Sequence, residues 1–191
     1  MCEKWFHVIC LGLKRCPPKN KPFNCVLCVI NTRFVTIKAE GDGRCFFRSV
    51  VISSNANLQT ANRDPFGCIT DSEMQLQETI LADALRQEVV KYMLANIADY
   101  SQLGEGINAD MPNGRKFTSL MDRINSMLTP TTMAGELEIS ALANSRKLCI
   151  EVYSNTSKPL TYGAKGGAEC CLKYTELAPG VGHYDCLVPK C

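Results

Sequence analysis

The chain has 191 residues, 46% hydrophobic and 21% charged, which is typical of one globular domain with a sizeable core and a small appendage. The formal net charge of +2 is uneven, because the first 40 residues hold seven Lys or Arg and two Glu. No apolar run approaches the about 18 residues that span a bilayer, and the N-terminus lacks the features of a signal peptide. We therefore expect no membrane segment and an intracellular protein of the cytoplasm or nucleus.

The N-terminal residues 1–30 form a separate, cysteine-rich unit. Five of the twelve cysteines of the chain lie in its first 28 residues. In a reducing compartment, metal ligands, a reactive thiol or core packing are more common roles for cysteine than disulfides. Thiolates and an imidazole at such spacings, closed by a CxxC pair, are typical of tetrahedral zinc. The predicted zinc ligands are Cys2, His7, Cys10, Cys25 and Cys28.

This unit resembles the second half of a PHD finger, with Trp5 and Phe6 before the histidine and Phe23 two residues before the last CxxC. The family pattern has eight ligands for two zinc ions, so the five present leave both sites incomplete. The alternatives are a truncated finger and a rearranged single-zinc site. The resemblance implies a chromatin or histone-tail partner, whereas the basic residues also fit a solvated loop.

Residues 33–38 alternate apolar and polar side chains, which predicts a strand that leads into the loop Gly41–Cys45. The apolar run that follows predicts a buried helix as far as Ser53, with Cys45 at its N-terminus. Unpaired amides and the helix dipole favour a thiolate at that position. Cys45 is therefore a candidate nucleophile, and the alternative is a buried structural cysteine.

The next predicted elements are a polar surface loop over 54–71 and a long helix. Asp71 or Ser72 caps this helix, which is expected to end near Tyr100. Apolar residues recur along it at four-residue spacing, which predicts a core-facing stripe. The residues of the stripe are Leu81, Leu85, Val89, Met93 and Ile97, with Ile80, Ala84 and Leu94 beside them.

Two more helices and two strands are predicted in the second half of the chain. A helix over 117–128 should turn Leu120, Met121, Ile124 and Leu128 inward, and a helix over 135–144 should bury Leu137, Ile139, Ala141 and Leu142. A buried strand is expected over 148–153. A glycine-rich loop then leads to another strand over 170–174.

The last motif is His183-Tyr184-Asp185. Side chains two apart on a strand share a face, so Asp185 can accept a hydrogen bond from His183 and stabilise the charged imidazole. The chain has two histidines, and His7 belongs to the cysteine-rich unit. His183 is therefore the candidate base for Cys45.

Together these residues resemble the ovarian tumour (OTU) family of cysteine proteases, over about residues 33–189. Asp42-Gly43-Arg44-Cys45 with the following Phe46-Phe47-Arg48-Ser49 matches the first block of the family. Gly135-Glu136-Leu137 with Ala141-Leu142-Ala143 matches the middle block, although Met133 and Ala134 replace its Trp and first Gly. The terminal block is His183-Tyr184-Asp185.

The resemblance implies an α+β OTU-like fold, with a small antiparallel or mixed sheet packed between helices. It implies a deubiquitinase that cleaves after the terminal glycine of ubiquitin or polyubiquitin, with Cys45 as nucleophile, His183 as base and Asp185 as acid. Asp42 would support the loop, and amides around Gly43 and Arg44 would receive the oxyanion. No cofactor is expected for catalysis. The alternatives are a catalytically silent ubiquitin-binding or chromatin-associated module, and a peptidase acting on a polyprotein or a ubiquitin-like modifier.

Overall fold

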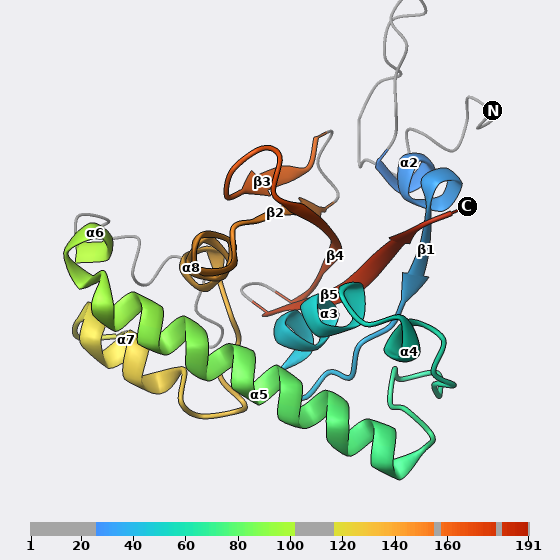
Figure 1. Ribbon diagram of the computed structural model, residues 1–191, viewed down its shortest axis with the longest axis horizontal. Coiled ribbons are helices and arrows are strands. Elements are labelled where there is room, and N and C mark those ends of the chain that lie inside the picture. Colours follow the sequence, from blue (N-terminus) through green and yellow to red (C-terminus); the bar gives the residue numbers. More distant parts are fainter. Residues whose placement is uncertain (1–25, 102–116, 155–157, 179–180, 191) are drawn as a thin grey trace, which may run out of the picture.

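The computed structural model of the chain describes residues 26–101, 117–154, 158–178 and 181–190, which form a mixed sheet with helices packed against it (Figure 1). This agrees with the predicted α+β class. The helices are α2 (Val26–Arg33), α3 (Cys45–Ser53), α4 (Ala56–Gln59), α5 (Ser72–Ala95), α6 (Ile97–Ser101), α7 (Leu120–Ser126) and α8 (Glu136–Arg146). The strands are β1 (Phe34–Ile37), β2 (Leu148–Tyr153), β3 (Leu160–Tyr162), β4 (Ala168–Ala178) and β5 (Val181–Pro189).

The five strands are ordered β1-β5-β4-β2-β3. β2 and β4 run parallel, and the other neighbours are antiparallel. β5, near the C-terminal end of the described chain, lies between β1 and β4, so it pairs with the strand that leads into the loop before α3. This arrangement brings the first and last motifs of the sequence into one region.

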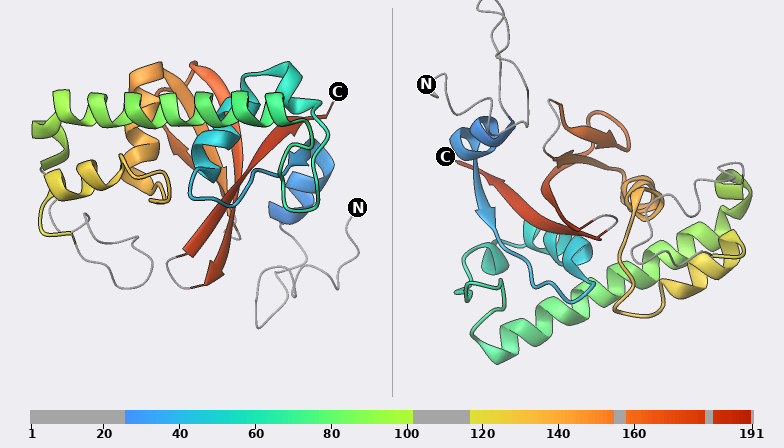
Figure 2. Two further views of the ribbon diagram at one scale, coloured as in Figure 1. Left: turned by 90° about the horizontal axis from the view of Figure 1, so that it is seen from below. Right: turned by 180° about the vertical axis from the view of Figure 1, so that it is seen from behind.

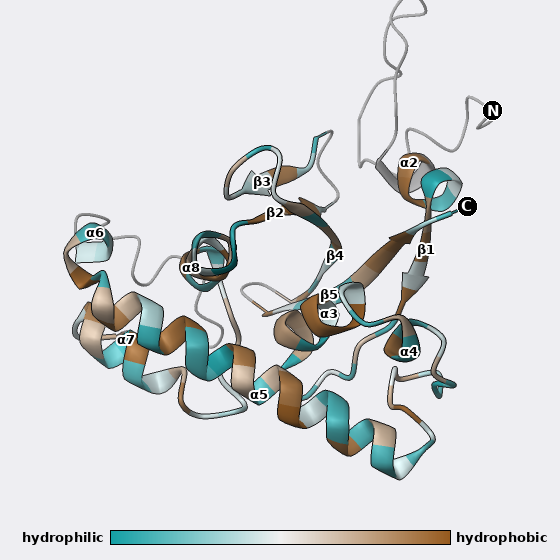
Figure 3. Ribbon diagram, viewed as in Figure 1, coloured by the Kyte–Doolittle hydropathy of each residue, from teal (hydrophilic) through white to brown (hydrophobic). Residues whose placement is uncertain are grey.

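The core lies between the sheet and the helices α3, α5 and α8. Figures 1 and 2 place α3 between α5 and the crossing strands β4 and β5. All residues from Cys45 to Ile52 in α3 are buried. Figure 3 shows hydrophobic colouring over much of α3, whereas α5 alternates between hydrophobic and hydrophilic segments. α3 is therefore a central helix, and α5 covers it with one face.

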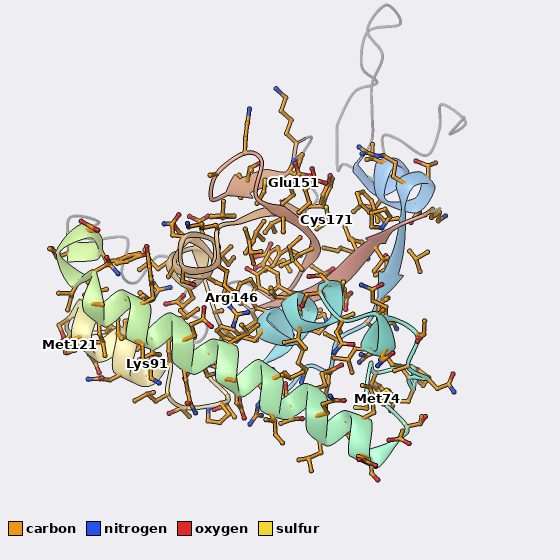
Figure 4. All side chains as sticks on the ribbon, in the orientation of Figure 1. Met74, Lys91, Met121, Arg146, Glu151 and Cys171 are labelled. Carbon is orange, nitrogen blue, oxygen red and sulfur yellow. The ribbon has the colours of Figure 1, made fainter. Side chains whose placement is uncertain are left out.

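The opposite face of the sheet carries a smaller cluster of Ile30, Phe34, Tyr153, Cys171 and Leu187. Figure 4 shows Cys171 and Glu151, which are paired across β4 and β2, on the side of the sheet nearest α2. Because α2 contributes Ile30 to this cluster, the helix packs on the main domain and crosses the boundary predicted at residue 30.

The long helix is shorter than the sequence predicts, and a different set of its residues is buried. It begins at Ser72, where the Asp71 carboxylate accepts the Met74 amide at 2.9 Å, which confirms the predicted cap. It ends at Ala95, and α6 follows as a separate turn. Leu85, Val89 and Met93 are buried as expected.

Part of the predicted stripe is wrong, because four of its residues are exposed, namely Ile80, Leu81, Ala84 and Leu94. The buried face instead includes two charged residues, Glu78 and Arg86, and its full set is Glu78, Ala82, Leu85, Arg86, Val89, Val90 and Met93. Spacing alone does not fix which of two adjacent rows of a helix faces the core.

Other predictions in this region need smaller corrections. In α7, Leu120 and Ile124 are buried, but Met121 is 43% exposed, and Figure 4 shows it on the outer side of the helix. Leu128 lies beyond the end of α7 and is 57% exposed. The segment predicted as a surface loop contains the short helix α4, capped by the Asn55 side chain, and buries Leu58 completely. β3 was not predicted from the sequence.

α8 matches its prediction, since Leu137, Ile139, Ala141 and Leu142 are all buried. Its first turn contains a buried ion pair in which Arg123 of α7 donates to the Glu138 carboxylate at 3.0 and 2.8 Å. The same carboxylate accepts the Gly135 amide at 2.7 Å. Glu138 therefore fixes the start of α8 and joins it to α7.

The helices of the described ranges include none that is both long and apolar enough to cross a bilayer.

Candidate active site

Cys45 is the first residue of α3 and is 4% exposed. The same helix is tied to β5 by Ser49, whose hydroxyl donates to the Tyr184 carbonyl at 3.0 Å, and by an edge-to-face contact between Phe46 and Tyr184. The buried helix thus holds the thiol at its N-terminus against the strand that carries His183.

His183 and Asp185 lie side by side on β5, as the two-residue spacing predicts. His183 Nε2 lies 2.9 Å from Asp185 Oδ1, and the same oxygen accepts the Ala39 amide at 3.2 Å. Asp185 is 8% exposed. The pKa of His183 is raised to about 10, first by its hydrogen bond to Asp185 and then by hydrogen bonding to Cys45.

The pairing of Nε2 with Asp185 determines which nitrogen remains for the thiol. Nδ1 lies on the side of the ring nearest Gly41, where a Cβ built on that glycine would be 3.8 Å away. The carboxylate therefore orients the imidazole, and Nδ1 is the nitrogen that remains for the Cys45 sulfur.

Asp42 is held by two arginines. Its carboxylate accepts the Arg44 amide and guanidinium, each at 3.0 Å, and Arg48 donates to it at 2.8 Å. Partial burial opposes ionisation, but hydrogen bonds and charge from Arg48, with further hydrogen bonds from Arg44, hold the pKa of Asp42 below its usual value. Arg48 is in turn paired with the buried Glu78 at 3.0 Å. Asp42 therefore stabilises the conformation of the loop Gly41–Cys45.

The loop amides are not equivalent. The Arg44 amide is used by Asp42, whereas the amides of Gly43 and Cys45 make no hydrogen bond within the described ranges. Gly43 has a φ of +85°, and a Cβ built on it would lie 2.7 Å from the Thr131 backbone. Only glycine fits there without strain, because the turn needs positive φ and the neighbouring backbone leaves no room.

Arg86 is a site component that the sequence analysis missed. This residue of α5 is 2% exposed, and its guanidinium donates to the Gly43 carbonyl at 2.9 Å. It also donates to carbonyls between Met127 and Thr132, and it stacks on the Phe47 ring at 4.7 Å. The available signal was a single arginine on the apolar face of a long helix, beside Leu85 and Val89.

A cavity of about 330 Å³ adjoins the strand that carries His183. Its walls include Gly182 and Tyr184 of β5, and the segment from Met133 to Glu136 at the start of α8. The Tyr174 ring packs directly over Gly182, where any Cβ would collide with it at 2.0 Å. Two carboxylates, Glu136 and Glu176, also line the cavity. The walls of the cavity are therefore partly apolar and carry two negative charges.

Four of the other described cysteines are poor candidates for the nucleophile. Cys149, Cys170, Cys171 and Cys186 are buried free thiols. Burial raises the pKa of Cys170 to about 11 and that of Cys171 to about 12. These residues fill the core around the sheet.

The structure brings together Cys45, His183, Asp185, Asp42, Gly43 and Arg44. Of the predicted zinc ligands, Cys2, His7, Cys10 and Cys25 lie outside the described residues, and Cys28 belongs to α2. Among the residues described, no group of three or more His, Cys, Asp or Glu could hold a metal ion. The zinc site stays a prediction.

The matches to known proteins point to one family. The sequence profile described as OTU-like cysteine protease matches residues 40–184 and does not extend to the cysteine-rich unit. No curated protein is similar to the chain. Solved structures share the fold: the viral OTU domain protease from Dera Ghazi Khan virus is 20% identical, with a TM-score of 0.55 and 85% of each chain covered.

Two further structures are similar. The OTU domain of OTUD1 is 16% identical, with a TM-score of 0.51. The match covers 82% of this chain and 84% of the OTUD1 chain. The second is OTUB1 in a complex with ubiquitin aldehyde and UBCH5B~Ub. It is 12% identical, with a TM-score of 0.54, and the match covers 97% of this chain and 88% of the OTUB1 chain.

Proposed function

The chain belongs to the OTU-like cysteine protease family, and we propose that it is a deubiquitinase that hydrolyses the bond after the C-terminal glycine of ubiquitin. The observation that carries this proposal is the arrangement of Cys45 at a buried helix N-terminus beside a histidine that Asp185 holds at 2.9 Å. The OTUB1 neighbour, solved with ubiquitin aldehyde, supports ubiquitin as the substrate.

The residues act in the following order. The Cys45 sulfur attacks the carbonyl carbon of the terminal glycine, with His183 in its protonated form beside the thiolate. His183 then gives its proton to the departing lysine amine as the tetrahedral intermediate collapses to a thioester. A water molecule, deprotonated by His183, releases the ubiquitin carboxylate and the free thiol. Asp185 keeps the imidazole oriented throughout.

The negative charge of the tetrahedral intermediate needs hydrogen-bond donors. The amides of Gly43 and Cys45 are unoccupied in the described structure, whereas the Arg44 amide serves Asp42. Gly43 and Cys45 are therefore the proposed donors. Arg44 and Asp42 keep the loop in shape.

The cavity between β5 and α8 would receive the chain that leads to the scissile bond. Gly182 and Tyr184 of its wall are the neighbours of His183 on β5, so we propose that a segment lying in the cavity leads toward the imidazole. Glu136 and Glu176 favour a segment that carries positive charge.

The test is covalent labelling with ubiquitin whose C-terminus carries a thiol-reactive warhead. We expect one adduct per chain, which is lost in Cys45→Ala and retained in Cys149→Ala. His183→Ala should abolish turnover of a fluorogenic ubiquitin amide. Labelling at Cys68 or Cys149 would contradict the assignment, and noncovalent binding without labelling would favour a silent ubiquitin-binding module.

A further inference from the structure

Arg86 has an unusual set of partners for a buried arginine. Within the described residues, every hydrogen bond of its guanidinium goes to a backbone carbonyl: Gly43 and Pro130 from one terminal nitrogen, and Met127, Thr129 and Thr132 from the other. Its Nε is buried without a hydrogen-bond partner. No carboxylate of the described ranges forms an ion pair with it.

Such an environment is costly for stability. A buried charge that lacks a counter-charge is normally expensive, and burial lowers the pKa of Arg86 from its usual value. An apolar side chain at this position would avoid that cost, but it would leave the five carbonyls without this donor. The carbonyl contacts therefore call for an explanation beyond packing.

The contacts join two segments of the active site. One is the catalytic loop, contacted at Gly43, and the other is the turn between α7 and α8, whose Thr131 backbone lies against the Gly43 α-carbon. Because a peptide group is planar, fixing the Gly43 carbonyl also fixes the Arg44 amide that points the other way. That amide donates to Asp42 at 3.0 Å. Arg86 and Asp42 thus hold the two ends of one peptide group.

We propose that Arg86 is a positioning residue for the oxyanion site: it locks the Gly43–Arg44 peptide in the orientation that leaves the Gly43 and Cys45 amides for the substrate oxygen. It does so by fastening the catalytic loop to the turn before α8. The guanidinium suits this role because its planar fork reaches several carbonyls at once. A lysine ammonium carries its charge on a single nitrogen and lacks this planar fork. This inference rests on the proposed function.

The experiment compares Arg86→Lys and Arg86→Met with the wild-type chain in two reactions. Hydrolysis of a fluorogenic ubiquitin amide needs the oxyanion donors, whereas alkylation of Cys45 by iodoacetamide does not. We expect kcat to fall about 100-fold or more in Arg86→Met, as for the loss of one oxyanion donor. KM and the alkylation rate should stay within about threefold, and Arg86→Lys should fall between the two.

Leu142→Ala is the control for a loss of stability alone. Leu142 is fully buried on α8, and its apolar side chain makes no hydrogen bond to the catalytic loop. We expect this variant to lose stability and keep its kcat. Unchanged kcat in Arg86→Met would overturn the proposal. A parallel fall of kcat and alkylation would also overturn it, because a purely structural defect affects both.

Hydrogen exchange separates this inference from the proposed function. If the wild-type chain does not process ubiquitin, the proposed function fails, and amide exchange of residues 41–45 decides the role of Arg86 alone. We expect the Arg44 amide to exchange at least about tenfold faster in Arg86→Lys, because its peptide group is released. Equal exchange in the two proteins would refute the positioning role without reference to any substrate.

Discussion

At the scale of single residues, the His183–Asp185 pair sets the pH range of the site. The pKa of His183 is raised to about 10, mainly by Asp185, so the imidazole stays protonated across the neutral range. The favoured form is the charged one. The pair therefore stabilises the fold fully below the usual histidine pKa of about 6.5, and this contribution is lost as pH rises through about 10.

Replacing Asp185 should move the alkaline limb of the activity profile. In Asp185→Ala, the largest cause of the raised pKa is gone, so we expect His183 to lose its proton at lower pH and kcat/KM to decline earlier on the alkaline side. The measurement is kcat/KM against pH with a ubiquitin amide, with the imidazole followed by NMR. Asp185→Asn, which keeps a hydrogen bond without the charge, should lie between. An alkaline limb that does not move would contradict the assignment.

Gly43 offers a second prediction at this scale. Gly43→Ala puts a Cβ 2.7 Å from the Thr131 backbone at a φ of +85°, so we expect the catalytic loop to shift and kcat to fall about 100-fold or more. Gly166 is the matched control, since its φ is +94° and its Cβ would meet nothing within 4 Å. Gly166→Ala should cost about 1–2 kcal/mol and leave kcat unchanged. Equal kcat in the two variants would count against the proposed role of the loop.

Chemistry at the residue scale was largely predictable. The spacing of His183 and Asp185 on a strand places them on one face, and a thiol after a glycine-rich loop before an apolar run starts a helix. Arg86 was not predictable in the same way. Its carbonyl partners lie in the segment Met127–Thr132, and no local pattern shows that a side chain of α5 reaches it.

At the scale of elements, the link between α3 and β5 is what keeps the thiol and the imidazole in register. Ser49 is fully buried and donates to the Tyr184 carbonyl at 3.0 Å, one residue from His183. Ser53, one turn later in α3, donates to the Val50 carbonyl and to the Cys170 sulfur of β4 at 3.2 Å. The two serines fasten the same helix to different strands.

Ser49→Ala and Ser53→Ala should therefore separate stability from catalysis. Each loses a hydrogen bond, and we expect each to cost about 1 kcal/mol, or about 2–4 °C in Tm. In Ser49→Ala, kcat should also fall about tenfold, because a small displacement of α3 moves Cys45 relative to His183. Thermal unfolding and ubiquitin-amide kinetics measure the two effects. A kcat in Ser53→Ala as low as in Ser49→Ala would refute the distinction.

Element types followed from periodicity, but their buried faces did not in every case. The helix over 72–95 was predicted from apolar spacing, yet Ile80 and Leu81 face solvent while Ala82 and Arg86 face the core. Adjacent rows of a helix surface differ by one residue, so packing partners decide which row is buried. β3 has three residues, too few for an alternating pattern.

At the scale of the whole molecule, ion pairs inside the helical layer connect parts far apart in the sequence. Arg123 and Glu138 are 1% and 0% exposed and join α7 to α8, and Arg146 joins α8 to Glu88 of α5 at 2.9 Å. The first pair is buried and the second is near the surface, so their loss should differ. A buried charge left without its partner costs far more than an exposed one.

Glu138→Ala should destabilise the chain by about 3–5 kcal/mol, because it leaves the Arg123 charge buried and frees the Gly135 amide. Replacing both partners, in Arg123→Met with Glu138→Leu, should recover much of the loss. Glu88→Ala, at the exposed pair, should cost under about 1 kcal/mol. Urea unfolding of the four proteins gives these values. A double variant as unstable as Glu138→Ala would show that the pair itself is needed.

The strand order could be predicted only from the resemblance to the OTU family, because the sequence patterns of single strands do not show how the strands pair. Alternation and apolar runs identify strands one at a time, whereas the pairing of β1 with β5 joins segments more than 100 residues apart, such as Ile37 with Cys186. Such contacts are selected by the packing of the whole core.

The position of β5 in the sheet has a consequence for when the protein can act. β5 lies between β1 and β4, yet the ribosome makes it after the other four strands that the structure describes. Cys45 therefore leaves the ribosome long before His183, and the thiol has no imidazole partner until β5 is inserted and the sheet is complete. We therefore expect proteolytic activity to begin only when the sheet is complete, and a nascent chain that still lacks β5 to be inactive.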